Sequence, residues 1–259
     1  MPTTQTTSSN TPVAIITGGS RGIGKSTALA LADRGIDVIL TYVSAEAEAN
    51  DVVRTIHEKG RKAVALRLDL GQASSFDAFV AEVRERLARV WSRDRFDFLV
   101  NNAGVGGSSL FEQTSESMFD ELVAVHFKGP FFLTQKLLPI MADGGRIVNL
   151  STGLTRYTYP GLSVYAAVKG AVEVLTRTLA VELGSRRITV NAVAPGGVIT
   201  DFGGGVMRDA ALQKTVAAET PLGRIGEPDD VSGVVAMLLA PEMRWITGQR
   251  VEVTGGYRL

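Results

Sequence analysis

Residues 13–24 have the sequence Val-Ala-Ile-Ile-Thr-Gly-Gly-Ser-Arg-Gly-Ile-Gly. The apolar, mostly β-branched residues 13–17 predict a strand, and residues 22–34 predict a helix. A glycine-rich turn between a strand and a helix is the context of a dinucleotide site, because amides at a helix N-terminus favour a pyrophosphate and residues without a Cβ let the backbone approach it. The spacing is G-x-x-x-G-x-G rather than G-x-G-x-x-G, so an ordinary tight turn remains the alternative at this point.

The alternation of strand and helix continues along the chain. Further strands are predicted at residues 37–42, 63–68, 98–101, 146–151, 188–194 and 250–253, and further helices at 45–59, 75–90, 115–141, 163–183 and 229–239. Such alternation predicts βαβ units and a parallel sheet covered on both faces. We therefore expect an α/β fold, a single-domain doubly wound (Rossmann) sheet at residues 13–259, after a disordered polar tail at residues 1–12.

Composition excludes several classes of protein. The chain of 259 residues has no cysteine, which excludes disulfides, thiolate metal sites and a cysteine nucleophile. Its 27 basic and 27 acidic side chains balance, which argues against a nucleic-acid or membrane-surface partner. No apolar run approaches the ~20 residues of a membrane helix. We expect a soluble, cytoplasmic protein, and its 28 glycines indicate many positions where the backbone approaches something closely.

The end of the second strand bears on the choice between NAD and NADP. Dinucleotide folds that bind NAD usually carry an acid there for the ribose 2′-hydroxyl, whereas this chain has Tyr42, Val43 and Ser44. Arg21, inside the glycine turn, could pair with a 2′-phosphate, and Ser44 could donate a hydrogen bond to it. We expect NADP(H), with NAD(H) use left open because Val43 stands where a second basic residue is usual.

Tyr165 and Lys169 are four residues apart in a predicted helix, so they lie on one face a turn apart. A phenol with a pKa of about 10 is a poor acid at neutral pH, but a cation within ~4–6 Å lowers that pKa by ~1–3 units. Two hydroxyls, Ser151 and Thr152, end the preceding strand, and doubly wound folds bind ligands at the carboxyl ends of their strands. These residues are candidates for a site that exchanges protons.

Taken together, these motifs resemble the classical short-chain dehydrogenase/reductase family, in particular its 3-oxoacyl-acyl-carrier-protein reductase-like branch. The resemblance covers the chain from about Val13 to Gly256. Its parts occur in the family's order: the glycine turn, Asp69-Leu70, Asn101-Asn102-Ala103-Gly104, a hydroxyl before Tyr165-x-x-x-Lys169, and Pro195-Gly196.

The resemblance implies an NADP(H)-dependent oxidoreductase that transfers hydride between nicotinamide and a ketone or secondary alcohol. In it Tyr165 is the general acid, Lys169 binds the nicotinamide ribose and depresses the tyrosine pKa, and Thr152 supplies a hydroxyl to the substrate oxygen, with Ser151 as the alternative. His126 stands where the family has an asparagine that helps to hold a water near the lysine. Because histidine ordinarily titrates near neutrality, this change either leaves activity normal or alters its pH dependence. A sensor that binds NADP(H) without catalysis is the alternative function.

The resemblance also implies a set of cofactor-binding residues. They are Gly18, Ser20, Arg21, Gly22, Ile23 and Gly24 in the turn, Tyr42 and Ser44 after the second strand, Asp69 and Leu70 at the adenine, Asn101, Ala103 and Gly104 at the adenosine ribose and sheet floor, Tyr165 and Lys169, and Pro195, Gly196, Val198 and Thr200 toward the nicotinamide and pyrophosphate.

The remaining expectations concern the substrate and partners. Tyr157 and Tyr159 point to a small-molecule carbonyl substrate with apolar or aryl bulk, and residues 203–205, all glycine, to the hinge of a lid. No metal is expected. Apolar and small residues around 131–133 and 166–171 suggest burial against other subunits, so we expect a homotetramer or homodimer.

Overall fold

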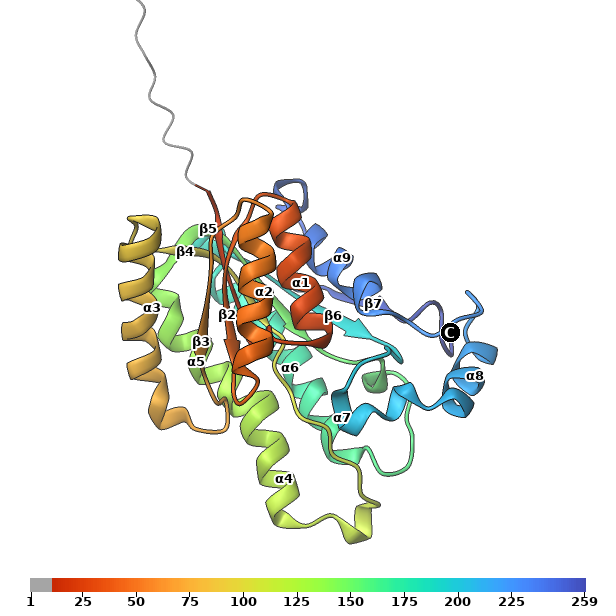
Figure 1. Ribbon diagram of the computed structural model, residues 1–259. Coiled ribbons are helices and arrows are strands. Elements are labelled where there is room, and N and C mark those ends of the chain that lie inside the picture. Colours follow the sequence, from red (N-terminus) through yellow and green to blue (C-terminus); the bar gives the residue numbers. More distant parts are fainter. Residues whose placement is uncertain (1–10) are drawn as a thin grey trace, which may run out of the picture.

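The computed structural model describes residues 11–259 (Figure 1). Residues 1–10, which hold most of the predicted tail, lie outside the described part. Seven parallel strands of the described residues form one sheet in the order β3-β2-β1-β4-β5-β6-β7. The strands are β1 (Val13–Ile16), β2 (Asp37–Tyr42), β3 (Ala63–Arg67), β4 (Phe96–Asn101), β5 (Met141–Leu150), β6 (Thr189–Pro195) and β7 (Arg250–Val253). The direction of winding reverses between β1 and β4, which confirms the doubly wound α/β fold.

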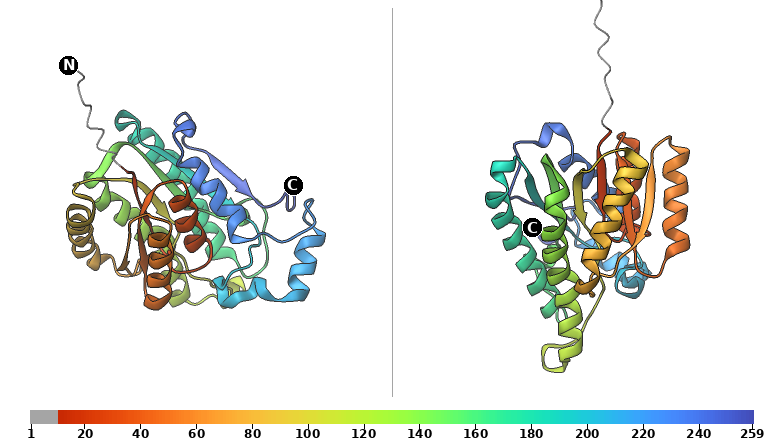
Figure 2. Two further views of the ribbon diagram at one scale, coloured as in Figure 1. Left: turned by 45° about the horizontal axis from the view of Figure 1, so that its top comes forward. Right: turned by 90° about the vertical axis from the view of Figure 1, so that its left-hand side faces the viewer.

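Helices cover both faces of the sheet (Figure 2). One face carries α1 (Gly22–Asp33), α2 (Glu46–Glu58) and α9 (Pro228–Leu238), and the other carries α3 (Phe76–Trp91), α5 (Gly129–Leu137) and α6 (Ser163–Glu182). Within β1, Ala14 and Ile16 pack on the first face and Val13 and Ile15 on the second. Burial on both faces explains why the central strands are continuously apolar rather than alternating.

The predicted helix at residues 115–141 is wrong as a single element. It divides into α4 (Glu116–Val123), a π-helical turn (Ala124–Lys128), α5 and a 3-10 turn (Leu138–Ile140), after which β5 already begins at Met141. Pro130 has no backbone N–H, so one hydrogen bond of a regular α-helix cannot form there. The N–H of the preceding residue, Gly129, donates to the Ala124 carbonyl five residues earlier, which is the π-helical pattern. The proline therefore accounts for the break next to His126.

Three helices extend past the sheet: α4, α7 (Phe202–Gly205) and α8 (Ala210–Ala218) (Figure 1). The three glycines of α7 all have positive φ, which L side chains rarely adopt, so α7 is an irregular turn rather than a regular helix. Among the described residues, no helix combines the length and hydropathy that crossing a membrane requires.

Candidate active site

The glycine turn connects β1 to the N-terminus of α1, as the sequence predicts. Gly18 has φ +66° and Gly22 has φ +55°. A Cβ on Gly18 would lie 2.9 Å from the Ala103 Cα, and one on Gly22 would lie 3.4 Å from the Thr200 Cγ2. No described side chain caps the first amides of α1. The turn therefore presents backbone N–H groups at a helix N-terminus, which suits an anionic group.

Asn102 stabilises this turn, although sequence analysis assigned it no individual role. Its Nδ2 donates to the carbonyl oxygens of Thr17 at 2.9 Å and Gly18 at 3.0 Å. The Thr17 hydroxyl accepts from the Asn102 N–H at 3.0 Å. Ser20 is buried and Ile23 half-buried in the same turn. The available signal was the second asparagine of the motif at residues 101–104, whose amide can bond two turn carbonyls at once.

A basic side chain lies beside the end of β2, where the sequence indicated that one was missing. Arg67 pairs in register with Tyr42, and its Nε donates to the Val43 carbonyl at 3.2 Å. Ser44 and Arg21 are both exposed. Arg67 comes from the neighbouring strand β3, so its place became evident only from the strand register. The end of β2 thus combines a nearby guanidinium with a hydroxyl, and no acid stands among residues 42–45.

The turn after β3 holds the two residues predicted to contact adenine. Asp69 Oδ1 accepts from the Gly71 N–H at 2.8 Å, and its Oδ2 accepts from Gln72 Nε2 at 3.0 Å. Leu70 is buried in the core beneath this turn. Asp69 therefore organises the turn rather than capping α3, and its contact with adenine stays a prediction.

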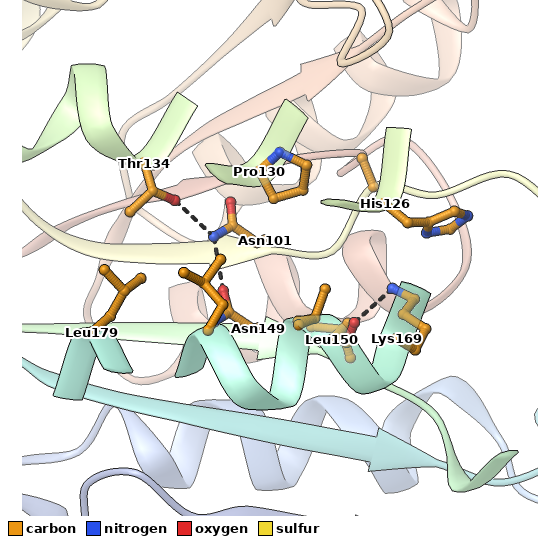
Figure 3. Close-up of a pocket in the computed structure, with 11 residues that line it drawn as sticks. Asn101, His126, Pro130, Thr134, Asn149, Leu150, Lys169 and Leu179 are labelled. Carbon is orange, nitrogen blue, oxygen red and sulfur yellow. Dashed lines mark hydrogen bonds between the residues drawn. The ribbon is translucent and has the colours of Figure 1, made fainter. Parts of the chain in front are cut away.

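Asn101 is the last residue of β4. Its side chain is buried and donates to Asn149 Oδ1 at 2.8 Å and to Thr134 Oγ1 at 3.1 Å, between the sheet and α5 (Figure 3). Its amide joins β4, β5 and α5, so this side chain belongs to the floor of the sheet, and its contact with the adenosine ribose stays a prediction. Gly104 lies closer to the site, since a Cβ there would be 2.5 Å from His126 Cε1.

Tyr165, Lys169 and Thr152 meet at the carboxyl end of β5. The Lys169 Nζ lies 5.8 Å from the centre of the Tyr165 ring and donates to the Leu150 carbonyl at 2.6 Å (Figure 3). Burial raises the pKa of Tyr165 above its ordinary value, and a hydrogen bond with Thr152 partly lowers it. Burial also lowers the pKa of Lys169 from 10.5 to about 8. The net direction for Tyr165 is contrary to the expected depression, because burial outweighs the lowering effect of Thr152.

The two candidate hydroxyls have different partners. Ser151 Oγ donates to Glu173 Oε1 at 2.6 Å. Thr152 Oγ1 accepts from the Leu154 N–H at 3.3 Å and lies near enough to the Tyr165 phenol to lower its pKa. Of the two, only Thr152 therefore presents its hydroxyl to the phenol, which favours the first of the two alternatives.

His126 is buried against the tyrosine. Its ring packs edge-to-face on Tyr165 at 5.1 Å, and its Nε2 lies 2.7 Å from the Val105 carbonyl. Burial, together with the charge of Lys169, lowers the pKa of His126 to about 3. His126 is therefore neutral at the pH where a histidine ordinarily titrates, and its effect on the pH dependence of activity stays a prediction. A neutral ring that bonds the Val105 carbonyl carries its proton on Nε2, which leaves Nδ1 as an acceptor.

A small cavity lies between the central strands β4 and β5 and the helices α5 and α6. It has a volume of about 10 Å³, and its lining includes His126, Lys169, Asn101, Thr134 and Asn149 (Figure 3). In the described part of the chain, neither His126 Nδ1 nor Asn101 Oδ1 has a hydrogen-bond partner. The cavity offers about the room that one water molecule needs.

The segment after β6 lies over the glycine turn. The N–H of Gly196 donates to the Val253 carbonyl at 3.0 Å as β6 ends at Pro195. Val198 pairs with Gly226, but the hydrogen bonds of this bridge use the backbone of residues 197 and 199 rather than that of Val198. The Val198 N–H is therefore not committed to the bridge. Thr200 contacts the turn near Gly22, as expected for a residue near a pyrophosphate.

Phe202, which the sequence did not single out, completes the site. Its ring lies 5.8 Å from that of Tyr165, and its Cε2 would lie 3.5 Å from a Cβ on Gly104. The residues present fit a nicotinamide dinucleotide, because a turn without Cβ atoms faces Thr200 on one side and leads to Tyr165 and Lys169 on the other.

Known proteins resemble the chain over almost its whole length. The sequence family described as enoyl-(acyl carrier protein) reductase matches residues 18–258. A 3-oxoacyl-[acyl-carrier-protein] reductase of Staphylococcus aureus strain Mu50 is 37% identical over 251 residues, which are 95% of this chain and 98% of that protein.

Two solved structures, each with a TM-score of 0.91, cover 96% of the chain. One is the promiscuous reductase LugOII, which catalyses keto-reduction at C1 during lugdunomycin biosynthesis, with 38% identity over 99% of its chain. The other is the angucycline C-6 ketoreductase LanV with bound NADP, with 36% identity over 96% of its chain. With the glycine turn, the Tyr165–Lys169 pair and the sheet order, these matches show that the chain is an oxidoreductase that belongs to the short-chain dehydrogenase/reductase family, close to 3-oxoacyl-acyl-carrier-protein reductases and ketoreductases.

Proposed function

We propose that the chain is an NADPH-dependent ketoreductase that converts a ketone to a secondary alcohol. The observation that carries this proposal is the meeting of Tyr165, Lys169 and Thr152 at the carboxyl end of β5, beside a glycine turn suited to a pyrophosphate. Bound NADPH supplies a hydride to the carbonyl carbon. The C=O π electrons pass to the oxygen, which takes the proton of the Tyr165 hydroxyl, and the product is the alcohol.

Thr152, Tyr165 and Lys169 have different roles at the carbonyl oxygen of the substrate. Thr152 donates a hydrogen bond that holds the oxygen and polarises the carbonyl, as a preorganised donor does for developing negative charge. Tyr165 is protonated at neutral pH because burial raises its pKa, so the proton that the oxygen needs is in place. Lys169 holds the nicotinamide ribose and stabilises the tyrosinate that forms, since its Nζ lies 5.8 Å from the phenol ring.

The end of β2 supports NADPH as the preferred cofactor. Arg21 and Ser44 are exposed there, and Arg67 lies next to Val43. Two guanidinium groups can form charge-assisted hydrogen bonds with a 2′-phosphate, whereas no residue of 42–45 is a carboxylate that would pair with a free 2′-hydroxyl. The relative LanV, which binds NADP, is consistent with this preference.

A groove of about 340 Å³ supports a substrate with aryl or polycyclic bulk. Its lining includes Leu110, Phe111, Leu154 and Tyr159, and it reaches Ala166, the residue after Tyr165. Such a mostly apolar wall favours a flat, hydrophobic ketone. Tyr157 instead packs against Tyr159 and the ring of Tyr257, so of the two predicted tyrosines only Tyr159 lines this groove.

A homotetramer or homodimer remains the proposed assembly. Exposed apolar side chains on α5 and α6 support it, namely Phe131, Phe132, Val174 and Val181. Isolated apolar residues are common on monomers, so the number of subunits needs a direct measurement such as light scattering after gel filtration.

The function is tested by following NADPH oxidation with aryl ketones, polycyclic ketones, β-keto esters and a 3-oxoacyl thioester, with an enoyl thioester as the rival reduction. Tyr165→Phe should lower kcat by at least about 100-fold while NADPH binding is unchanged. Tyr257→Phe is the matched control for kcat, because its phenol bonds Glu219 and the Tyr159 hydroxyl of the groove rather than Tyr165, Lys169 or Thr152. Tight NADPH binding without turnover of any ketone would favour the sensor, and full activity of Tyr165→Phe would refute the mechanism.

The choice of hydroxyl has its own variants. Thr152→Ser should keep most activity, and Thr152→Val should lose it, because only the former retains a donor for the substrate oxygen. If Ser151→Ala were instead the inactive variant and Thr152→Val active, the roles of the two residues would be exchanged.

A further inference from the structure

A network of alternating acidic and basic side chains contacts residues 151–155, the segment that carries Thr152. Arg250 Nε on β7 lies 2.7 Å from Glu173 Oε1 on α6, and Arg250 Nη1 lies 2.8 Å from Glu252 Oε2. Arg156 Nη2 lies 2.6 Å from the other oxygen of Glu252. The Glu173 side chain is 12% exposed and that of Arg250 is 21% exposed. The central pair is thus well shielded from solvent, although neither residue lies in the site described above.

The central pair holds the backbone on both sides of Thr152. Before it, Ser151 Oγ donates to Glu173 Oε1 at 2.6 Å. At Thr152 itself, Arg250 Nη2 donates to the carbonyl oxygen at 3.2 Å. After it, Thr155 Oγ1 lies 2.8 Å from Glu173 Oε1 and 3.0 Å from the Thr152 carbonyl. The residues on each side of Thr152 are therefore tied to one carboxylate and one guanidinium.

Glu173 also continues the active-site face of α6. It lies four residues after Lys169 and eight after Tyr165, so the three side chains stand on one face at successive turns. Each faces a different residue at or just after the end of β5: Tyr165 lies beside Thr152, Lys169 donates to the Leu150 carbonyl, and Glu173 accepts from Ser151. The contact between Glu173 and Ser151 fixes the end of β5 relative to α6, the helix that also carries Tyr165 and Lys169.

A partly buried pair of charges is a poor source of stability, because desolvation offsets much of the attraction, so its position calls for another explanation. We propose that Glu173 and Arg250 are positioning residues that hold the Thr152 hydroxyl against Tyr165 and the substrate oxygen. Neither touches the reacting atoms, and both act through the backbone of residues 151–155. The inference rests on the proposed function, since it gives the pair a role only if Thr152 is the hydroxyl donor.

The test measures kcat, KM for the ketone and the Kd of NADPH in Arg250→Gln and Glu173→Gln. Because a displacement of about 1 Å at the reacting groups can cost 100-fold, we expect kcat to fall about 10- to 100-fold while KM and the NADPH Kd change less than about threefold. Arg250→Lys keeps the charge but loses the fork that reaches the Thr152 carbonyl, so it should recover kcat only in part. Thr155→Val removes one hydroxyl with little change of shape and should lower kcat more mildly.

A double-mutant comparison separates positioning from general damage. Once Thr152→Val has removed the hydroxyl, adding Arg250→Gln should lower kcat no further, because nothing is left to position. Arg186→Gln is the matched control. Arg186 likewise bridges a carboxylate, Asp143 at 2.7 Å, and a backbone carbonyl, that of Met141 at 2.6 Å, but it does so at the start of β5. It should leave kcat unchanged.

The outcomes distinguish the two proposals. If Thr152→Val is inactive and Arg250→Gln keeps the wild-type kcat, the positioning role is overturned and the proposed function stands. Fully multiplicative losses in the double variant would also overturn positioning. If Thr152→Val is fully active, the proposed donor is refuted and the positioning role falls with it. Should Arg250→Gln fail to fold, Thr155→Val and its combination with Thr152→Val decide the question in the same way.

Discussion

Replacing Lys169 with methionine tests the electrostatics of the site without any turnover assay. Lys169 is 5% exposed, and its ammonium group has one backbone acceptor, the Leu150 carbonyl. Burial lowers its pKa from 10.5 to about 8, so folding disfavours the charged form. We expect wild-type stability to carry a penalty at neutral pH that Lys169→Met does not carry, and we expect this penalty to vanish at high pH.

The sign follows from proton binding. Between pH 8 and pH 10.5 the unfolded chain keeps a proton on Lys169 that the folded chain releases, so wild-type stability rises with pH in this window. At about 1.4 kcal/mol per pKa unit, the penalty is about 3 kcal/mol at pH 7 and about 1 kcal/mol at pH 10. The bond to Leu150 that the variant loses shifts its curve by a similar amount at both pH values. The free energy of unfolding of Lys169→Met, relative to wild type, should therefore be higher by about 2–3 kcal/mol at pH 7 than at pH 10.

Urea unfolding without nucleotide, followed by circular dichroism at a series of pH values from 7 to 10, measures this difference. Other groups titrate in the same range, but they are common to both proteins and cancel. Lys214→Met is the control for the loss of a lysine, because Lys214 is exposed on α8. Parallel curves for wild type and Lys169→Met across this range would refute the reasoning, since they would show that the buried amine titrates as it does in the unfolded chain.

Three further changes test the surroundings of the site. His126→Asn should leave the pH limits of kcat unchanged between pH 5 and pH 8, because an imidazole with a pKa of about 3 stays neutral there; a limb near pH 6.5 that only the wild type shows would contradict this. Arg67→Gln should weaken binding of 2′,5′-ADP about three- to tenfold more than binding of 5′-AMP in calorimetric titrations, and equal losses would remove Arg67 from the phosphate site. Gly24→Ala should cost about 1–3 kcal/mol in urea unfolding, because its Cβ would lie 2.5 Å from Asn102 Nδ2, whereas Gly233→Ala, with nothing within 4 Å, should not destabilise; similar values for both would refute the close approach.

The strands were predictable because burial on both faces demands uninterrupted apolar runs. The predicted strand at 37–42 matches β2 to the residue, and the one at 250–253 matches β7, a half-buried edge strand in which charged residues alternate with valines. The helix at 115–141 failed because apolar periodicity continues through Pro130 while the hydrogen bonds do not. A pattern of side chains records which residues face the core, but it does not record which backbone groups have partners.

The candidate site divides in the same way. The Tyr165–Lys169 pair and the glycine turn are local, and spacing along the chain was enough to find them. The place of Arg67 depends on the register of β2 with β3, which brings it to Val43, 24 residues earlier in the chain. The choice between Thr152 and Ser151 depends on the contact of Ser151 with Glu173, 22 residues later. Only the fold brings those partners together, so no spacing rule could have supplied them.

Burial of Tyr165 and of Lys169 favours one direction of the proposed reaction over the other. Desolvation keeps the Tyr165 phenol protonated, and it brings the pKa of Lys169 down to about 8. Ketone reduction consumes the phenol proton, so this resting state is ready for it, whereas alcohol oxidation must first remove that proton from a group whose pKa is raised. The same burial that costs stability at Lys169 therefore favours reduction at neutral pH and moves oxidation toward alkaline pH. Raising the pH should increase the rate of oxidation relative to that of reduction, and a ratio independent of pH would show that the proton resides elsewhere.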